Sequence, residues 1–303
     1  MIVPPEDFAD RPASPVDLLS ELLRSVRLRG ERIATYGPLW TFSVGFSGAG
    51  ALHIVDEGEV ELRMDGVPQV ERATRGDVIL LPRGDPHHIS DVGERVGAPA
   101  PQPARWLSGT FTIGDPQASH LLASLPPVIT LRGAGGPALE GLEVARRMLL
   151  AEMQSPSQGS AVMIARILDL LFIQILRAWA ADDAAEPNWL AGALDPEIGP
   201  ALSAVHRDPG HDWTVEELAR ACRMSRSAFA ARFVARVGKP PATYLAHVRL
   251  DAAADLLRDT SLPITVIGEN VGYTSEAAFN RAFKHRYGKP PARWRRDAAA
   301  THS

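Results

Sequence analysis

Hydrophobic positions change their spacing along the chain, and the change marks two kinds of structure. From about residue 31 to residue 113, apolar and polar residues alternate, which is typical of β-strands with one buried face. Leu52–Val55 and Val60–Met64 flank an Asp-Glu-Gly-Glu turn, so we predict a hairpin there. Asp77–Pro82 predicts a buried strand and Trp106–Ile113 a further strand. Many short strands between Gly and Pro turns favour a sandwich or barrel.

Two helical stretches follow the strands, at Ala138–Glu152 and Ala161–Ala180. Apolar residues occupy most faces of the second stretch, so that helix must be covered on most sides. It packs either on the barrel or on its mate in another subunit, and we favour the dimer contact. Residues 182–195 are rich in alanine, acidic residues and proline, and we predict an interdomain linker there.

The last hundred residues contain an internal repeat at an offset of fifty. Ser225–Pro241 and Ser275–Pro291 share nine identities in seventeen positions. Each copy predicts a helix that starts at the serine and ends at Gly238 or Gly288. A short helix and a tight turn are predicted directly before each copy. Two short helices with a three- to four-residue turn are typical of the helix-turn-helix motif. An ordinary helical hairpin is the alternative interpretation. The presence of two copies favours the helix-turn-helix interpretation over it.

A helical period also runs through Tyr244–Leu257, between the two copies. About sixteen residues of helix extend roughly 25 Å. A rigid spacer of this size can hold two recognition helices about one DNA turn, ~34 Å, apart. We expect both to enter successive major grooves on one face of a duplex. A further helix is predicted at Glu197–His206, after Asp195-Pro196.

Charge supports a nucleic-acid partner for the repeat because it is unevenly distributed. The whole chain carries a net charge of −4, yet residues 206–303 hold 16 Lys and Arg against 10 Asp and Glu, a net of +6. The remainder therefore has a net charge of −10. A cationic end on an anionic body indicates a polyanion partner for that end alone.

Composition narrows the class of protein. Hydrophobic residues make up 45% and charged residues 22%, which is a globular balance. The single Cys222 excludes internal disulfides and a Cys-rich zinc site. Residues 1–15 do not have the pattern of a secretory signal, and the longest apolar run is too short for a membrane span. We therefore expect a soluble cytoplasmic protein without a membrane partner.

Exposed positions at the start of each second helix are expected to face base edges. Arginine can pair with guanine and asparagine with adenine, glutamate can accept from cytosine, and alanine can contact a thymine methyl. The predicted DNA-binding residues are Ser225, Arg226, Ser227, Ala230, Ala231, Arg232, Ser275, Glu276, Ala277, Asn280, Arg281 and Lys284. The predicted phosphate contacts are Arg232, Arg236, Lys239, Lys284, Arg286 and Lys289.

Two runs in this region carry a specific resemblance. Tyr244-Leu245, Arg249-Leu250 and Leu256-Leu257 resemble the linker helix of the AraC/XylS family of transcription regulators. Ile267–Ser275 followed by Phe279–Lys284 resembles that family's second-motif signature. The resemblance covers about a hundred residues. It implies double-stranded DNA as a partner and leaves RNA polymerase open as a further one.

A second resemblance concerns the strand-rich half. Gly76, Pro82, Gly84 and His87 have the spacing of the second cupin motif. Together with the motif at Asp17–Gly30, they resemble the cupin-type sensor domains that precede AraC-type DNA-binding domains. This implies a small jelly-roll barrel that binds a small-molecule effector.

Two histidines are the candidate pocket residues. We expect His53 to point into the same barrel as His87, and we assign both to the effector pocket. Cupin enzymes hold a metal with a His-x-His pair, a Glu and a later His, and this chain has His87 at the later position without the His-x-His pair. Two imidazoles make a poor metal site. We therefore predict no metal, no cofactor and no catalytic residue.

The predicted fold class is α+β with two domains. A cupin-like sensor domain spans 17–135, a helical dimerisation segment 138–181, a linker 182–195 and an AraC-type DNA-binding domain 196–299. We favour a homodimeric, ligand-responsive regulator. Two alternatives stay open: a cupin metalloenzyme with a DNA-binding appendage, and a DNA-binding protein whose barrel only dimerises. Ligand-dependent DNA affinity, bound metal and turnover separate the three.

Overall fold

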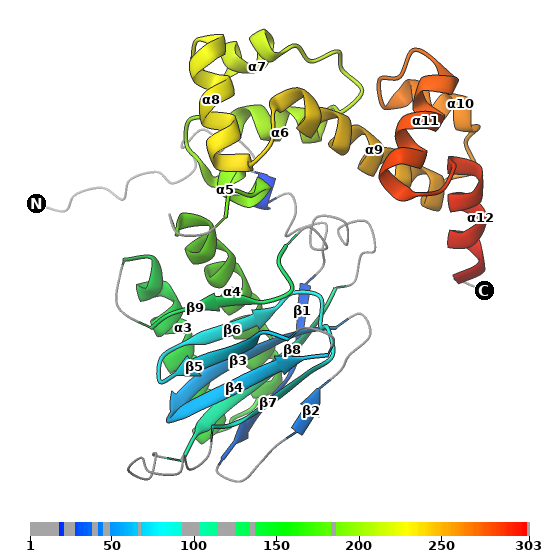
Figure 1. The fold of residues 1–303 in the computed structure, drawn as a ribbon. Coiled ribbons are helices and arrows are strands. Elements are labelled where there is room, and N and C mark those ends of the chain that lie inside the picture. Colours follow the sequence, from blue (N-terminus) through cyan, green and yellow to red (C-terminus); the bar gives the residue numbers. More distant parts are fainter. Residues whose placement is uncertain are drawn as a thin grey trace, which may run out of the picture. The chain divides into compact units, whose positions relative to one another are not determined.

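The computed structural model describes residues 18–20, 28–37, 42–44, 49–65, 68–92, 103–113, 125–133, 137–182 and 186–301. The chain forms two compact units, Leu23–Ala185 and a second unit made of Met1–Leu22 with Glu186–Ser303. The first unit holds the described strands and two long helices, and the second is helical (Figure 1). Parts of three predicted segments lie outside the described residues, namely Asp17 and residues 21–27 of the sensor motif, 134–135 and 183–185.

The described residues contain nine antiparallel strands in two sheets. The strands are β1 (Leu28–Tyr36), β2 (Phe42–Val44), β3 (Ala49–Glu57), β4 (Glu59–Met64), β5 (Val70–Thr74), β6 (Val78–Leu81), β7 (His87–Asp91), β8 (Arg105–Ile113) and β9 (Ile129–Leu131). One sheet has the order β1-β8-β3-β6-β9, and the other has the order β2-β7-β4-β5. This two-sheet arrangement agrees with the sandwich or barrel predicted from the alternation.

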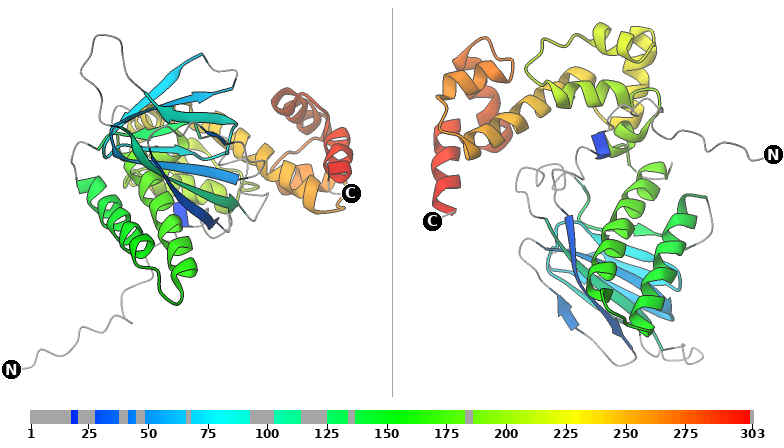
Figure 2. Two further views of the ribbon diagram at one scale, coloured as in Figure 1. Left: turned by 90° about the horizontal axis from the view of Figure 1, so that it is seen from below. Right: turned by 180° about the vertical axis from the view of Figure 1, so that it is seen from behind.

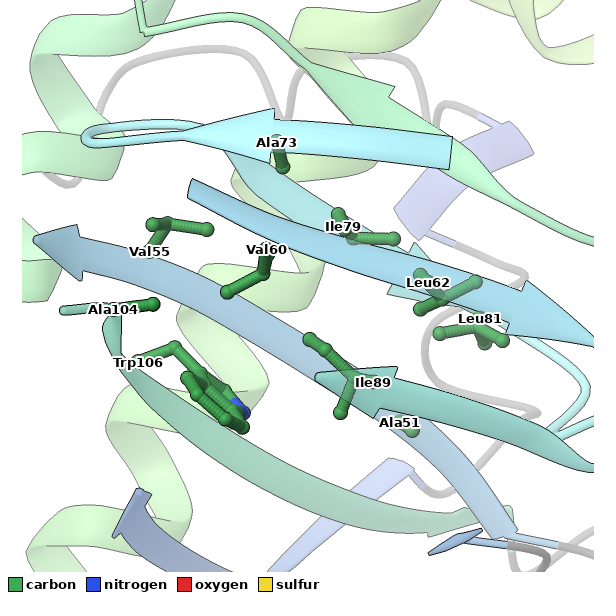
Figure 3. Close-up of a cluster of buried hydrophobic side chains, with 10 residues drawn as sticks. All are labelled: Ala51, Val55, Val60, Leu62, Ala73, Ile79, Leu81, Ile89, Ala104 and Trp106. Atoms are coloured by element: carbon green, nitrogen blue, oxygen red, sulfur yellow. The ribbon is translucent and has the colours of Figure 1, made fainter. Parts of the chain in front are cut away.

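A hydrophobic core fills the space between the two sheets (Figure 3). Ala51 and Val55 of β3 and Trp106 of β8 pack with Val60 and Ile89 of the other sheet, and each is at most 1% exposed. Every second residue of a strand faces the core, which is why these positions are apolar. Fully burying one such large side chain contributes about 1.5–3 kcal/mol.

The predicted strands are present, but the predicted hairpin is wrong. The predicted buried strand is β6, in which all four residues are buried, and the later strand is β8. β3 pairs with β6 and β8, whereas β4 pairs with β5 and β7 in the other sheet. Gly58, with φ of 72°, makes the corner between them. Alternation is the same for a hairpin and for a chain that changes sheet, so the pattern could not separate the two.

Two helices, α3 (Pro137–Gln154) and α4 (Ser160–Ala181), lie side by side across the outer face of the five-stranded sheet (Figure 2). The side chains that α4 buries are Ile167, Leu168, Leu171, Phe172, Ile175, Leu176, Ala178 and Ala180. Of the two coverings expected for this helix, the structure shows the one on the barrel. A dimer contact stays a prediction.

Close packing of α4 on β1 depends on Gly30. A Cβ atom at this position would lie 2.7 Å from both the Ala165 carbonyl oxygen and the Leu168 Cβ. The Gly30 N–H also donates to Asp169 Oδ1 at 2.9 Å. The glycine of the sensor motif therefore lets the helix approach the sheet closely.

The helical unit contains α5 (Trp189–Leu194), α6 (Gly199–Arg207), α7 (Val215–Ala221), α8 (Arg226–Val237), α9 (Pro241–Asp259), α10 (Ile264–Asn270), α11 (Glu276–Tyr287) and α12 (Pro291–Thr301). Helix α5 occupies part of the stretch 182–195 that was predicted as a linker, so that prediction is corrected for residues 189–194. Trp189 and Leu190 are buried, and the Asn188 side chain caps the helix by accepting the Ala191 N–H. No helix among the described residues has the length and apolar character needed to cross a membrane.

Candidate DNA-binding surface and sensor cavity

The first helix-turn-helix unit consists of α7 and α8. Thr214 and Glu217 form a capping box at the start of α7: the Glu217 N–H donates to Thr214 Oγ1 at 3.1 Å, and the Thr214 N–H donates to Glu217 Oε2 at 2.9 Å. Arg223, with φ of 54°, lies in the turn. Ser225 then caps α8 by accepting the Ala228 N–H at 3.3 Å.

The second unit, α10 and α11, repeats this construction. Gly272, with φ of 83°, makes the turn. Ser275 caps α11 by accepting the Ala278 N–H at 3.4 Å. Pro263 is the cap residue immediately before α10. The two units therefore share the local chemistry that their sequence identities predicted.

Buried phenylalanines fix the rotation of both second helices. Phe229 and Phe233 of α8, and Phe279 and Phe283 of α11, are each at most 1% exposed. The opposite faces consequently remain open at the leading ends. Exposed there are Ser225, Arg226, Ser227, Ala231, Ser275, Glu276, Ala277, Arg281 and Lys284, and half-buried are Ala230, Arg232 and Asn280. This is the presentation that a recognition helix needs.

A carboxylate that the sequence did not reveal holds two arginines of α8. The Asp195 side chain is 1% exposed and lies 3.0 Å from Arg232 Nη2 and 3.1 Å from Arg236 Nε. It also accepts the Glu197 and Ile198 N–H groups at 2.9 and 3.1 Å. Burial acts to raise the pKa of Asp195, and these hydrogen bonds outweigh it, so the pKa lies below its ordinary value. In the sequence, Asp195-Pro196 indicates the start of a helix but does not indicate that Asp195 pairs with arginines of α8.

Two more of the predicted phosphate contacts, Arg286 and Lys289, form ion pairs with carboxylates of the helices that flank the second helix-turn-helix unit. Arg286 donates from Nε and Nη2 to the Asp251 carboxylate of α9, each at 2.8 Å, and Tyr287 Oη donates to the same group at 2.6 Å. Lys289 Nζ lies 2.5 Å from Asp297. In the part of the chain that the structure describes, the predicted phosphate contacts outside ion pairs are Lys239 and Lys284.

The predicted histidine pair lies between the two sheets of the strand-rich unit, Leu23–Ala185. His53 and His87 are 0% and 1% exposed, and their Nε2 atoms are 2.9 Å apart. His87 Nδ1 is 2.7 Å from the Asp85 carbonyl oxygen, and His53 Nδ1 is 2.7 Å from Ser108 Oγ. A carbonyl can only accept, so we assign the proton of His87 to Nδ1. His53 then donates from Nε2 to His87, and the Ser108 hydroxyl donates to His53.

In this assignment both rings are neutral. Burial, and secondarily the neighbouring His87, lowers the pKa of His53 to about 3. Burial also lowers the pKa of His87, although the hydrogen bond to Asp85 acts in the opposite direction. Both imidazoles are therefore uncharged at neutral pH.

Among the residues that the structure describes, the histidine pair does not fit a cupin metal. Two imidazole nitrogens on one tetrahedral zinc ion lie about 3.3 Å apart, given Zn–N bonds of ~2.0–2.1 Å. The two Nε2 atoms are only 2.9 Å apart, and they are hydrogen-bonded to each other. Within the described ranges, no group of three or more His, Cys, Asp or Glu side chains is arranged to hold a metal ion.

A cavity of about 520 Å³ opens beside the histidine pair. Its polar lining includes His53, Ser108 and Thr110, and a break in the β1 register places Arg32 opposite Thr110. Tyr36 and small apolar side chains complete much of the wall. This volume is within the range of small-molecule sites, roughly 300–1,000 Å³. Sequence reasoning missed Ser108, although alternation with the core residue Trp106 would have placed it on the inner face.

Comparison with known proteins decides the family. Residues 17–181 match the family model described as cupin, and residues 218–297 match the one described as helix-turn-helix domain. A putative AraC-like transcription regulator of Streptomyces antibioticus is 31% identical over 303 residues, covering 93% of this chain and 99% of that protein. The chain belongs to the AraC-like transcription regulators. Family membership confirms the predicted α+β fold class and the predicted role in DNA-binding transcription regulation.

Two further relatives of this regulator extend over nearly the whole chain. The HTH-type transcriptional regulator AlkR of Acinetobacter baylyi is 30% identical, covering 93% of this chain and 100% of that protein. The RCS-specific HTH-type transcriptional activator RclR of Escherichia coli is 30% identical, covering 92% and 97%. Among solved structures, the DNA-binding domain of AdpA in complex with a target DNA is 25% identical, covers 35% of this chain and 95% of that chain, and has a TM-score of 0.34.

Proposed function

We propose that this AraC-like regulator is controlled by a small molecule bound in the cupin unit and acts on DNA as a cytoplasmic homodimer. The observation that carries the DNA-binding part is the duplicated unit, in which α8 and α11 both present open leading ends. Arg226 of α8, and Glu276, Asn280 and Arg281 of α11, are our proposed base-reading side chains because their hydrogen-bonding groups match base edges. Lys239 and Lys284 are our proposed phosphate contacts.

Ligand control is supported by the cavity beside His53. Hydroxyl groups, an imidazole and apolar side chains converge on a space large enough for a small molecule. A ligand that fits one conformation of the unit better than another shifts the population toward it, and DNA affinity then follows through the dimer geometry. We propose regulation rather than catalysis. The Nε2 atoms of His53 and His87 are hydrogen-bonded to each other, so neither is open to a substrate.

Dimerisation is supported by apolar side chains left open on α3 and α4. Val144 and Met148 of α3 are 47% and 45% exposed, and Met163 and Leu170 of α4 are 47% and 38% exposed. The first pair is separated by four residues and the second by seven, so each pair lies along one face of its helix. Covering such faces with a second copy removes apolar surface from water.

Selection of bound DNA from a random pool, repeated with candidate effectors, tests the proposed function. We expect one enriched site with two different halves, and an effector that changes the affinity for that site. Enrichment of no sequence would refute sequence-specific binding. A site whose affinity no effector changes, on a protein that still dimerises, would instead favour a barrel used only for dimerisation.

A further inference from the structure

Arg249, in the middle of α9, reaches a loop of the first helix-turn-helix unit. Its Nε donates to the Pro209 carbonyl oxygen at 2.9 Å, and its Nη2 donates to the His211 carbonyl oxygen at 2.8 Å. Both acceptors belong to the connection between α6 and α7. One guanidinium therefore ties the spacer helix to backbone that directly precedes α7.

The same guanidinium also contacts the turn of the second unit. A Cβ atom at Gly272 would lie 2.8 Å from Arg249 Cζ and 2.9 Å from the Gly210 carbonyl oxygen. A Cβ at Gly210 would in turn clash with the Asn270 carbonyl oxygen. The α6–α7 loop, the guanidinium and the turn after α10 are thus packed together with no room for an extra carbon atom.

We propose that Arg249 is a positioning residue that fixes the two helix-turn-helix units relative to each other and so selects the spacing of the DNA half-sites. This rests on the proposed binding of DNA by both units. Helix α9 packs against both units. A single helix connection still permits bending at its ends, and a second attachment near its middle removes that freedom.

Half-site spacing is a sharp readout of such a clamp. One base pair inserted between two half-sites rotates them by about 35° and separates them by about 3.4 Å, since a turn of ~34–36 Å contains 10–10.5 base pairs. A rigid pair of recognition helices cannot follow this change, whereas a loosely connected pair can. A cavity of about 290 Å³ beside Arg249, lined in part by Trp213 and Tyr273, leaves room for the loop to shift once the guanidinium is gone.

The experiment compares Arg249→Met, Arg249→Lys and the matched control Arg258→Met in the full chain. Arg258 lies on the same helix and pairs with Asp255 and Asp259 of that helix. Affinities are measured for the selected site, for the site with one inserted base pair, and for each half-site alone. A misplaced half-site should cost the wild type a factor of about 30 or more, because a lost base contact is worth ~1–3 kcal/mol.

For Arg249→Met we expect half-site affinity within about twofold of the wild type, intact-site affinity about tenfold lower, and an insertion penalty below about fivefold. Arg249→Lys, which keeps the charge and part of the donor capacity, should recover some of the spacing preference, and Arg258→Met should match the wild type. An unchanged insertion penalty in a folded Arg249→Met protein overturns the proposal.

A distance measurement keeps the proposal testable if these variants do not fold. Spin labels at Ala235→Cys and His285→Cys, in a Cys222→Ser background, report the separation of α8 and α11 with Arg249 in place. We expect one narrow distance distribution without DNA, and a broad one overturns the clamp. Because this measurement needs no DNA, the clamp and the proposed DNA binding fail separately.

Discussion

Acid should destabilise the cupin unit through His53. The folded pKa of this buried imidazole is about 3, against an ordinary value of 6.5. Between these two pH values the unfolded chain binds a proton that the folded chain does not, so stability falls as the pH drops below 6.5. At pH 5, about 1.5 pH units below the unfolded pKa, the loss is about 2 kcal/mol, since each unit is worth ~1.4 kcal/mol.

Calorimetric unfolding of the full chain at pH 7 and pH 5 measures this loss. For a unit of this size, about 2 kcal/mol corresponds to a shift in Tm of roughly 4–8 °C. We compare the wild type with His53→Gln, which cannot take up a proton, and with His88→Gln as a control on β7, the strand that carries His87. The half-exposed side chain of His88 lies outside the core. The acid-induced fall in Tm should be smaller by that amount in His53→Gln alone. An equal fall in all three proteins would refute the linkage argument.

Three further predictions concern packing, an ion-paired hub and base reading. Gly30→Ala should lower the free energy of unfolding by about 1–3 kcal/mol in urea, because the added Cβ meets the backbone of α4. Gly37→Ala is the control: its added Cβ meets nothing within 4 Å, so stability should change by no more than ~0.5 kcal/mol. Asp195→Ala should cost about 2–4 kcal/mol by the same assay, since it removes the buried carboxylate that pairs with Arg232 and Arg236 and leaves two backbone N–H groups before α6 without their acceptor. A loss under about 0.5 kcal/mol contradicts this. Arg281→Ala should weaken binding to the selected DNA about 5- to 150-fold in a titration, and unchanged affinity shows that the assigned register of α11 is wrong.

Periodicity and end signals predicted most elements of the fold. Strands β6 and β8, the long helices α3 and α4, and the paired short helices of the repeat all lie where the spacing of apolar residues placed them. The predictions failed where two structures share one local pattern. Alternation at β3 and β4 is equally compatible with a hairpin and with a corner between sheets, and only long-range pairing separates them. The linker estimate rested on composition, and it included the short apolar segment that folds as α5.

Side-chain partners distant in sequence account for the missed parts of the site. Asp195 and Arg232 are 37 residues apart, and Asp251 and Arg286 are 35 apart. Pairs so far apart in the sequence produce no periodic pattern. Ion-paired and other basic residues of the repeat therefore look alike in the sequence, and both kinds were predicted as phosphate contacts. The histidine pair could be predicted because the cupin resemblance placed both residues in one barrel. Its third member, Ser108, could not be ranked above other inner-face residues without the 2.7 Å contact to His53.

Duplication has preserved the scaffold of the two units and changed their leading surfaces. The identities between the copies include the capping serines, the buried phenylalanines and the left-handed glycines, which are positions required by helix geometry and packing. The proposed base-facing positions differ in every case: Arg226, Ser227, Ala230 and Ala231 correspond to Glu276, Ala277, Asn280 and Arg281. Two equivalent helices with different functional groups cannot prefer the same bases. One chain should therefore recognise a site without internal symmetry. Any palindromic character of the operator would then have to come from a second chain.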